Sequence, residues 1–121
     1  MLNPEEFPTV FKNKLPTYGF RVGAGWHTLL REAFGIIETF LREHPEHQEF
    51  FRIVEVKSKF GALRIYTSTK APKEIAQALA QAEELSMRTC ETCGDVASEN
   101  TSSAYYVSCF EHGPKTLIEP Q

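Results

Sequence analysis

The sequence predicts an α+β fold in which two helices pack on a β-hairpin or small antiparallel sheet, with a small cysteine-rich module at the C-terminal end. Three observations support this prediction. Two stretches repeat apolar residues at steps of three and four, as amphipathic helices do. Two short runs between them are rich in β-branched and aromatic residues, which favour strands. Paired ligand-type residues follow the second helical stretch.

The N-terminal residues 1–25 predict an irregular arm. Prolines and glycines recur there too often for a regular element, while several aromatic residues suggest that the arm packs on the domain body. At Trp26, an expected core anchor, apolar residues begin to recur at helical spacing. This periodicity predicts a helix over residues 26–44. The helix is expected to end before Pro45, because proline lacks an amide hydrogen and clashes with the preceding turn.

A β-hairpin is predicted over residues 50–69. Its two strand-like runs flank the segment 58–61, which contains a glycine suited to a tight turn. Pro72 then opens a second helix, predicted over residues 72–88, because a missing amide hydrogen costs nothing in the first helical turn. The predicted α+β body therefore spans residues 26–88 and leads directly into the first cysteine pair.

A structural zinc site is indicated by four residues near the C-terminus, namely Cys90, Cys93, Cys109 and His112. They read C-x-x-C, then 15 intervening residues, then C-x-x-H. A glycine follows each pair and allows a sharp backbone turn after the second ligand. Zinc favours thiolate and imidazole ligands, and four protein ligands leave no open position for a catalytic water. We therefore expect structural Zn²⁺ in a zinc-ribbon-like knuckle pair over residues 89–113, followed by a tail over 114–121.

Other interpretations of these residues are weaker. A redox C-x-x-C pair needs a thioredoxin-like βαβ context, which the sequence lacks, and the third alternative is a set of unrelated buried thiols. No helical pattern follows the second pair, which favours a ribbon over a treble clef. Glu91 and Glu111 lie inside the knuckles and are expected to be solvated. His44 and His47 share the x-x spacing but have no partner pair, so a solvated helix end is expected there.

Basic and aromatic residues cluster on the predicted hairpin and its C-terminal flank: Lys57, Lys59, Phe60, Arg64, Tyr66 and Lys70. Such cations can neutralise phosphates, and an exposed ring can stack on a base. The alternative is a solvated hairpin whose rings lie in the core. Charge elsewhere disfavours a polyanion, because the net charge of the chain is −3 and residues 26–50 and 89–121 are acidic.

Composition limits the function classes. A chain of 121 residues forms one domain, or one domain with a small metal-bound appendage. It has no apolar segment long enough for a bilayer and no secretory signal, and its three cysteines suit a reducing compartment, so a cytoplasmic protein without membrane contact is expected. No nucleophile triad, phosphate loop or paired-carboxylate motif stands out, so no enzymatic activity is expected.

Three stretches resemble a family of small uncharacterised proteins from bacteriophages and prophages. They are Gly25-Trp26-His27, the run Val56-Lys57-Ser58-Lys59-Phe60-Gly61-Ala62-Leu63-Arg64-Ile65-Tyr66, and the run Glu83-Glu84-Leu85-Ser86-Met87-Arg88-Thr89-Cys90-Glu91-Thr92-Cys93-Gly94. The resemblance covers residues 25–113 and implies a protein of a mobile element in the host bacterial cytoplasm. In these relatives the second metal pair is usually cysteine-based, so His112 departs from the family, an exchange that zinc accepts. The family supplies no established activity.

These observations predict a small zinc-stapled protein-interaction module. On the resemblance, it would be a phage-encoded modulator or inhibitor of a host protein, such as a defence protein. Its acidic segments, residues 26–50 and 89–121, would face a basic surface of that partner. The alternative prediction is a nucleic-acid-binding accessory protein that uses the basic hairpin over residues 57–70.

Overall fold

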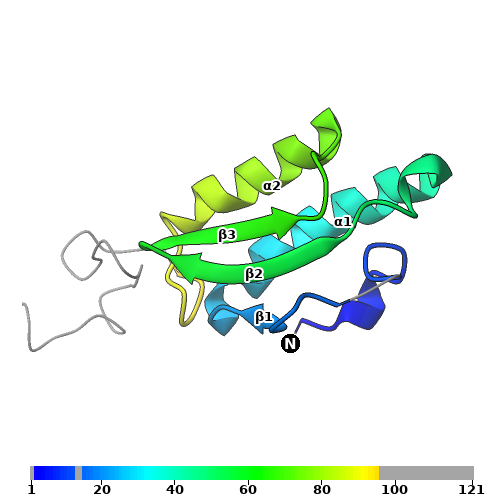
Figure 1. The fold of residues 1–121 in the computed structure, drawn as a ribbon. Helices are drawn as coiled ribbons and strands as arrows, with labels where there is room; N and C mark the ends of the chain where they lie inside the picture. Colours follow the sequence, from blue (N-terminus) through cyan, green and yellow to red (C-terminus); the bar gives the residue numbers. More distant parts are fainter. Residues whose placement is uncertain (1, 13–14, 96–121) are drawn as a thin grey trace, which may run out of the picture.

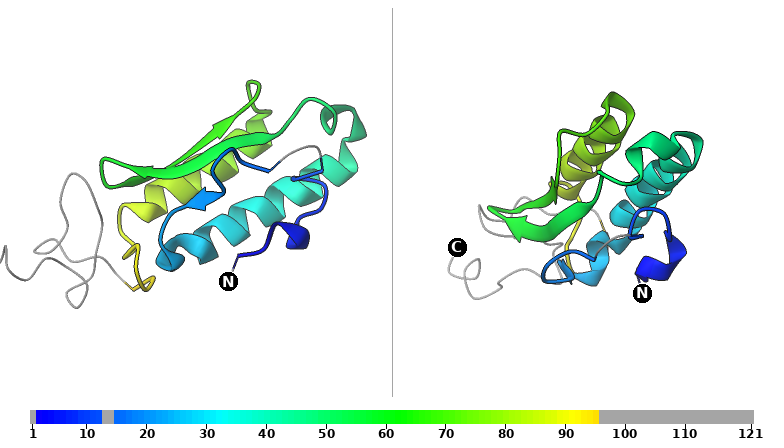
Figure 2. Two further views of the ribbon diagram at one scale, coloured as in Figure 1. Left: turned by 60° about the horizontal axis from the view of Figure 1, so that its bottom comes forward. Right: turned by 45° about the vertical axis from the view of Figure 1, so that its right-hand side comes forward.

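The computed structural model describes residues 2–12 and 15–95. It confirms the predicted α+β class: two helices lie side by side on one face of a three-stranded sheet (Figure 1). The other face of the sheet carries no helix in this part of the chain (Figure 2). The predicted second knuckle and tail fall in residues 96–121, outside the described residues.

The two helices match the sequence periodicity closely. Helix α1 spans His27–Glu43 and follows a short 3₁₀ turn at Ala24–Trp26, while α2 spans Lys73–Ser86. Pro72 was expected inside the first helical turn but is the N-cap residue instead, because its ψ of 157° is extended. Neither helix of the described chain is long and apolar enough to cross a bilayer.

The hairpin forms as predicted, and the sheet gains a strand that was not predicted. Strands β2 (Ile53–Lys59) and β3 (Ala62–Thr67) pair antiparallel around the two-residue turn Phe60-Gly61. Both turn residues have positive φ, 53° and 77°, as in the type I′ turns that match the twist of paired strands. Strand β1 (Phe20–Arg21) pairs parallel with β2, so the arm over residues 1–25 is not wholly irregular.

One core joins the helices, the sheet and the arm. Trp26 is fully buried, as expected for a core anchor, and packs in the cluster that holds the sheet against both helices. The arm is fastened by Glu38 of α1, whose carboxylate accepts hydrogen bonds from the backbone amides of Thr9 and Val10 at 3.0 Å and from Arg42 Nε at 2.9 Å. Burial alone would raise the pKa of the Glu38 carboxyl, but these donors outweigh it and hold the pKa below its ordinary value.

The outer edge of β3 is covered by side chains of α2. Ser86 Oγ accepts a hydrogen bond from the Leu63 amide at 2.9 Å, and Glu83 Oε2 accepts one from the Ile65 amide at 3.1 Å. Amides on a free sheet edge invite pairing with another chain. These two contacts block strand addition along β3 and fix α2 against the hairpin.

Candidate metal centre and basic sheet face

The first cysteine pair forms a tight turn directly after α2. The Gly94 amide donates to the Cys90 carbonyl at 2.8 Å, and the Cys90 amide donates to the Asp95 carbonyl at 2.7 Å. Gly94 has a φ of 88°, so the sequence expectation of a left-handed residue after the second cysteine is met. The Cys90 side chain is buried, and that of Cys93 is exposed. We call residues 89–95 the first knuckle.

The first knuckle is docked on the segment before α1. The Gly25 amide donates to the Glu91 carbonyl at 2.7 Å, and the Gly23 amide donates to Glu91 Oε2 at 2.9 Å. The indole Nε1 of Trp26 donates to the Thr89 carbonyl at 2.8 Å. Glu91 was expected to be a solvated carboxylate. Its carboxylate instead joins the knuckle to the body by accepting the hydrogen bond from the Gly23 amide, a contact that the sequence does not indicate.

The backbone of the first knuckle lies so close to Gly25 that no residue with a side chain would fit at this position. A Cβ added there would collide with the Cys90 carbonyl oxygen and lie 2.5 Å from the Gly94 nitrogen and 2.7 Å from the Cys93 nitrogen. All three are backbone atoms, which cannot swing aside. These contacts join residues 25–27 to residues 83–94, two of the three stretches on which the family resemblance rests. The hydrogen bonds of Ser86 and Glu83 to strand β3 join residues 83–94 to the remaining stretch, residues 56–66.

Two of the four predicted zinc ligands lie within the described residues. Cys90 and Cys93 are brought together by the knuckle turn, whereas Cys109 and His112 fall outside the described range. Within residues 2–12 and 15–95, no three cysteine, histidine or acidic side chains are grouped as metal ligands. A C-x-x-C turn with a left-handed glycine after it suits a tetrahedral thiolate site, so the residues present fit half of a zinc centre.

Three cations from three different strands form a row on the outer face of the sheet. Arg21 of β1 is paired with Lys57 of β2, and Lys57 is paired with Arg64 of β3. Paired residues point to the same face, and neighbouring strands lie about 4.8 Å apart, so the row is about 10 Å long. The preceding row, Phe20 with Val56 and Ile65, faces the helices and packs in or against the core. We call Arg21, Lys57 and Arg64 the basic row.

Two exposed tyrosines flank the basic row. The Arg21 guanidinium lies 5.3 Å from the ring centroid of Tyr18, and Lys57 Nζ lies 5.5 Å from that of Tyr66. Tyr18 is 65% exposed and Tyr66 is 40% exposed, so both rings border solvent. Glu55 Oε1 lies 3.5 Å from Lys57 Nζ and offsets part of the positive charge.

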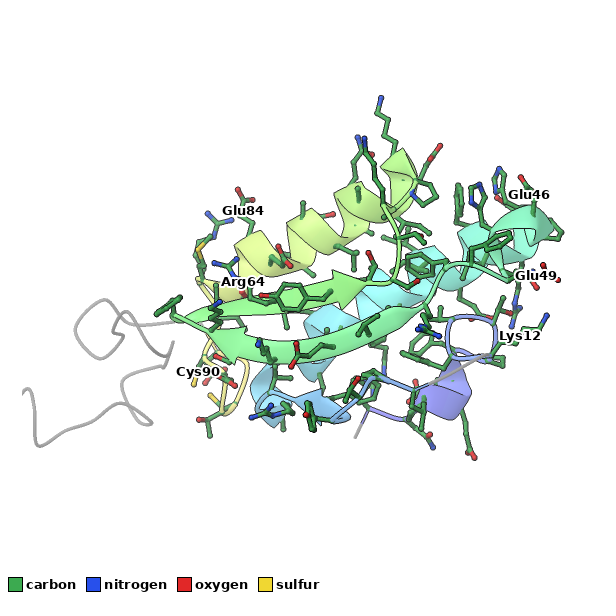
Figure 3. The ribbon with its side chains drawn as sticks, in the orientation of Figure 1. Lys12, Glu46, Glu49, Arg64, Glu84 and Cys90 are labelled. Atoms are coloured by element: carbon green, nitrogen blue, oxygen red, sulfur yellow. The ribbon has the colours of Figure 1, made fainter. Side chains whose placement is uncertain are left out.

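The structure divides the cluster predicted on the hairpin. Lys57, Arg64 and Tyr66 share the outer face, while Lys59 and Phe60 lie at the tip, where Lys59 Nζ is 5.6 Å from the Phe60 ring. Phe60 is 62% exposed, which excludes the interpretation that it packs into the core. Lys70 follows the opposite end of β3 and is not part of this surface. Figure 3 shows Arg64 near the end of the molecule that holds Cys90.

Sequence reasoning missed two members of this surface. Tyr18 and Arg21 both come from the arm. Arg21 precedes its partner Lys57 by 36 residues in sequence, and the two-residue strand that carries it is too short to show an alternating apolar pattern. The only indication was that a glycine is followed by an aromatic residue, Phe20, which is partly buried against the core, and then by the cation Arg21. Neither residue could be aligned with the hairpin without the parallel register.

The two histidines at the end of α1 form a small ring cluster. His44 stacks on Phe40 with ring centroids 4.1 Å apart, and its Nδ1 lies 2.9 Å from the Phe40 carbonyl oxygen. The His47 ring centroid lies 6.2 Å from that of His44. Both histidines are half-buried against α1, so the expected solvated helix end is a packed one.

Comparison with known proteins gives no match to a family model, to a curated protein or to a solved structure. The resemblance to small phage proteins therefore stays a prediction.

Proposed function

We propose that this chain is a small nucleic-acid-binding module that holds a single strand on the outer face of its sheet. The observation that supports this proposal best is the basic row, in which Arg21, Lys57 and Arg64 lie in register across three strands. This surface fits the alternative prediction from sequence, extended by one cation and one ring from the arm.

The shape of the surface favours a single strand. A flat sheet face with exposed rings offers platforms on which unpaired bases stack, and base–aromatic stacking contributes about 1–3 kcal/mol per base. Tyr18 and Tyr66 are each held by a cation of the row, so a ring and a phosphate partner are presented together. Duplex recognition usually inserts a helix or a ribbon into a groove, and in the described part of the chain no helix lies on this face of the sheet.

Three cations on an otherwise acidic chain predict weak, strongly salt-dependent binding. Each neutralised phosphate of a single strand contributes about −0.7 to the slope of log K against log salt, so the row predicts a slope near −2. Zinc, in this proposal, has a structural role, with Cys90, Cys93, Cys109 and His112 as its four ligands. On the family resemblance, the setting would be the host bacterial cytoplasm.

Fluorescence anisotropy with a dye-labelled oligo-dT of about 12 nucleotides tests the proposal in low salt. The double variant Arg21→Ala/Arg64→Ala removes two cations of the row, one exposed and one partly exposed, and should abolish most of the binding. The matched control Lys70→Ala/Lys73→Ala removes two exposed cations outside the face and should leave binding close to that of the wild type. Equal loss in the two variants, or no binding by the wild type at low salt, would sink the proposal.

The stacking component is tested separately. The variants Tyr18→Leu and Tyr66→Leu keep an apolar side chain but remove the aromatic face, so affinity should fall about fivefold or more while the salt slope stays unchanged. An unchanged affinity would mean that the face binds phosphates alone.

A further inference from the structure

A groove lies between α1 and α2. Both helices lie on the same face of the sheet, and the groove is on their side that faces away from it (Figure 2 shows the helices and the sheet). Its wider end has a volume of about 800 Å³. The narrower part has an apolar floor that includes Leu29, Ile36 and Leu85. Ile36 lies in both parts and is 49% exposed, although its neighbour Ile37 is fully buried. An aliphatic side chain so placed leaves apolar surface uncovered between two helices.

The wider end of the groove has an acidic rim. Glu32 and Glu43 of α1 and Glu74 of α2 line it, and all three are exposed. Glu32, Ile36 and Glu43 fall on one stripe of α1, because they are separated by four and seven residues. Arg31 also lines this end, but its guanidinium Nε pairs with Glu6 Oε1 at 3.1 Å, which offsets its charge.

We infer that this groove docks an amphipathic helix of a partner protein whose polar face is basic. Its apolar stripe would cover Ile36 and the floor, and its lysines or arginines would meet Glu32, Glu43 and Glu74. A helix laid between two others buries its apolar face in this way. The inference goes beyond nucleic-acid binding, uses the opposite side of the molecule, and gives the predicted protein-interaction role a location on α1.

Charge distinguishes this occupant from the alternatives. A second copy of the chain would set its own glutamates against those of the first, and like charges at an interface disfavour association. A polyanion would be repelled by the same rim. A basic helix is attracted to the rim and contributes the apolar contacts that the floor lacks.

The test uses a synthetic, dye-labelled 16-residue peptide with leucines along one helical stripe and lysines on both sides of that stripe, where they can reach the rim. A scrambled peptide of the same composition, which has no apolar stripe, is the matched control. Both are titrated into the full-length protein by fluorescence anisotropy. We expect micromolar binding of the amphipathic peptide and at least tenfold weaker binding of the scrambled one.

Protein variants locate the site. Ile36→Ala and the double variant Glu32→Gln/Glu43→Gln should each weaken the peptide roughly tenfold, which corresponds to about 1.4 kcal/mol. The control Glu46→Gln/Glu49→Gln removes the same charge at the end of the molecule far from Cys90 and should have little effect (Figure 3). Arg21→Ala/Arg64→Ala should leave peptide binding unchanged, which separates this inference from the proposed function.

Four outcomes would overturn the inference. They are the absence of binding by the full-length protein, equal binding of the scrambled peptide, equal weakening by the control glutamate variant, and a dimer that Ile36→Ala dissociates. The last outcome would assign the groove to a second copy of the chain. Because Ile36 and both glutamates are exposed, circular dichroism of these variants should match that of the wild type.

Discussion

The close approach at Gly25 makes Gly25→Ala the sharpest perturbation of this structure. The added methyl would overlap the Cys90 carbonyl oxygen and crowd the nitrogens of Cys93 and Gly94. Because these are backbone atoms of a tight turn, the substitution should push the first knuckle off the body. The displacement breaks contacts that join segments more than 60 residues apart in sequence.

The magnitude follows from the hydrogen bonds that would be lost. The knuckle is held by Gly25 and Trp26 donating to backbone carbonyls and by Gly23 donating to the Glu91 carboxylate. Each such bond contributes about 0.5–1.5 kcal/mol net, and somewhat more where one partner is charged. We therefore expect Gly25→Ala to lower the free energy of unfolding by about 3 kcal/mol, a large share of the 5–15 kcal/mol typical of a domain.

Urea unfolding followed by far-ultraviolet circular dichroism measures this loss. With slopes of about 1–3 kcal/mol per molar urea, the midpoint should fall by about 1–3 M. Gly35→Ala is the matched control, since a Cβ at Gly35 in α1 would lie 4.0 Å from its nearest neighbour, Phe7 Cε1. Alanine favours a helix interior by about 0.8–1 kcal/mol over glycine, so the control should be stabilised. A Gly25→Ala midpoint within 0.2 M or so of the wild type would refute the docking geometry.

Four further predictions follow from single contacts. The pKa of the Glu38 carboxyl is lowered in the folded protein, so its contribution to stability is complete above the ordinary value of 4.5 and is lost as pH falls through the folded-state pKa. Urea midpoints of the wild type should therefore fall at acidic pH for this reason, and those of Glu38→Gln should lack this part of the fall. Ser86→Ala should cost about 1–3 kcal/mol in urea unfolding, because the buried amide of Leu63 loses its acceptor; unchanged stability would contradict that assignment. Phe60→Asn should raise the thermal midpoint, since asparagine tolerates positive φ better than a bulky ring, and a lower midpoint would show that the ring is needed for folding. If zinc is bound as proposed, protein purified without added metal should contain about one equivalent of it, and Cys93→Ser should contain much less. Elemental analysis measures both contents, and equal contents would exclude Cys93 as a ligand.

The helices and the hairpin were predictable because their signals are local. The stripe from Trp26 to Leu41 reports one buried helix face, and the glycine at position 61 falls at the hairpin turn. Their bounds differ by a few residues from those expected, mainly at element ends. The α+β class follows from these local patterns alone.

The basic row and the docking of the first knuckle were not predictable, since both depend on register between distant segments. Arg21 joins Lys57 only through a two-residue parallel strand, whose pairing reflects tertiary packing and not propensity. Glu91 meets Gly23 across 68 residues, and nothing in a C-x-x-C motif indicates which backbone its intervening glutamate will reach. The sequence therefore indicates which residues can bind a metal or a phosphate, but not which distant residues lie beside them in the fold.

The indole of Trp26 gives the molecule a built-in optical probe. It is the chain's single tryptophan, and its ring nitrogen donates to the Thr89 carbonyl, between the end of α2 and the first cysteine. Emission excited at the red edge of protein absorption therefore reports on that junction alone, without dye or label. If the proposed zinc ion holds the junction in place, titrating a chelator into the native protein should shift this emission, and the shift would report the release in real time.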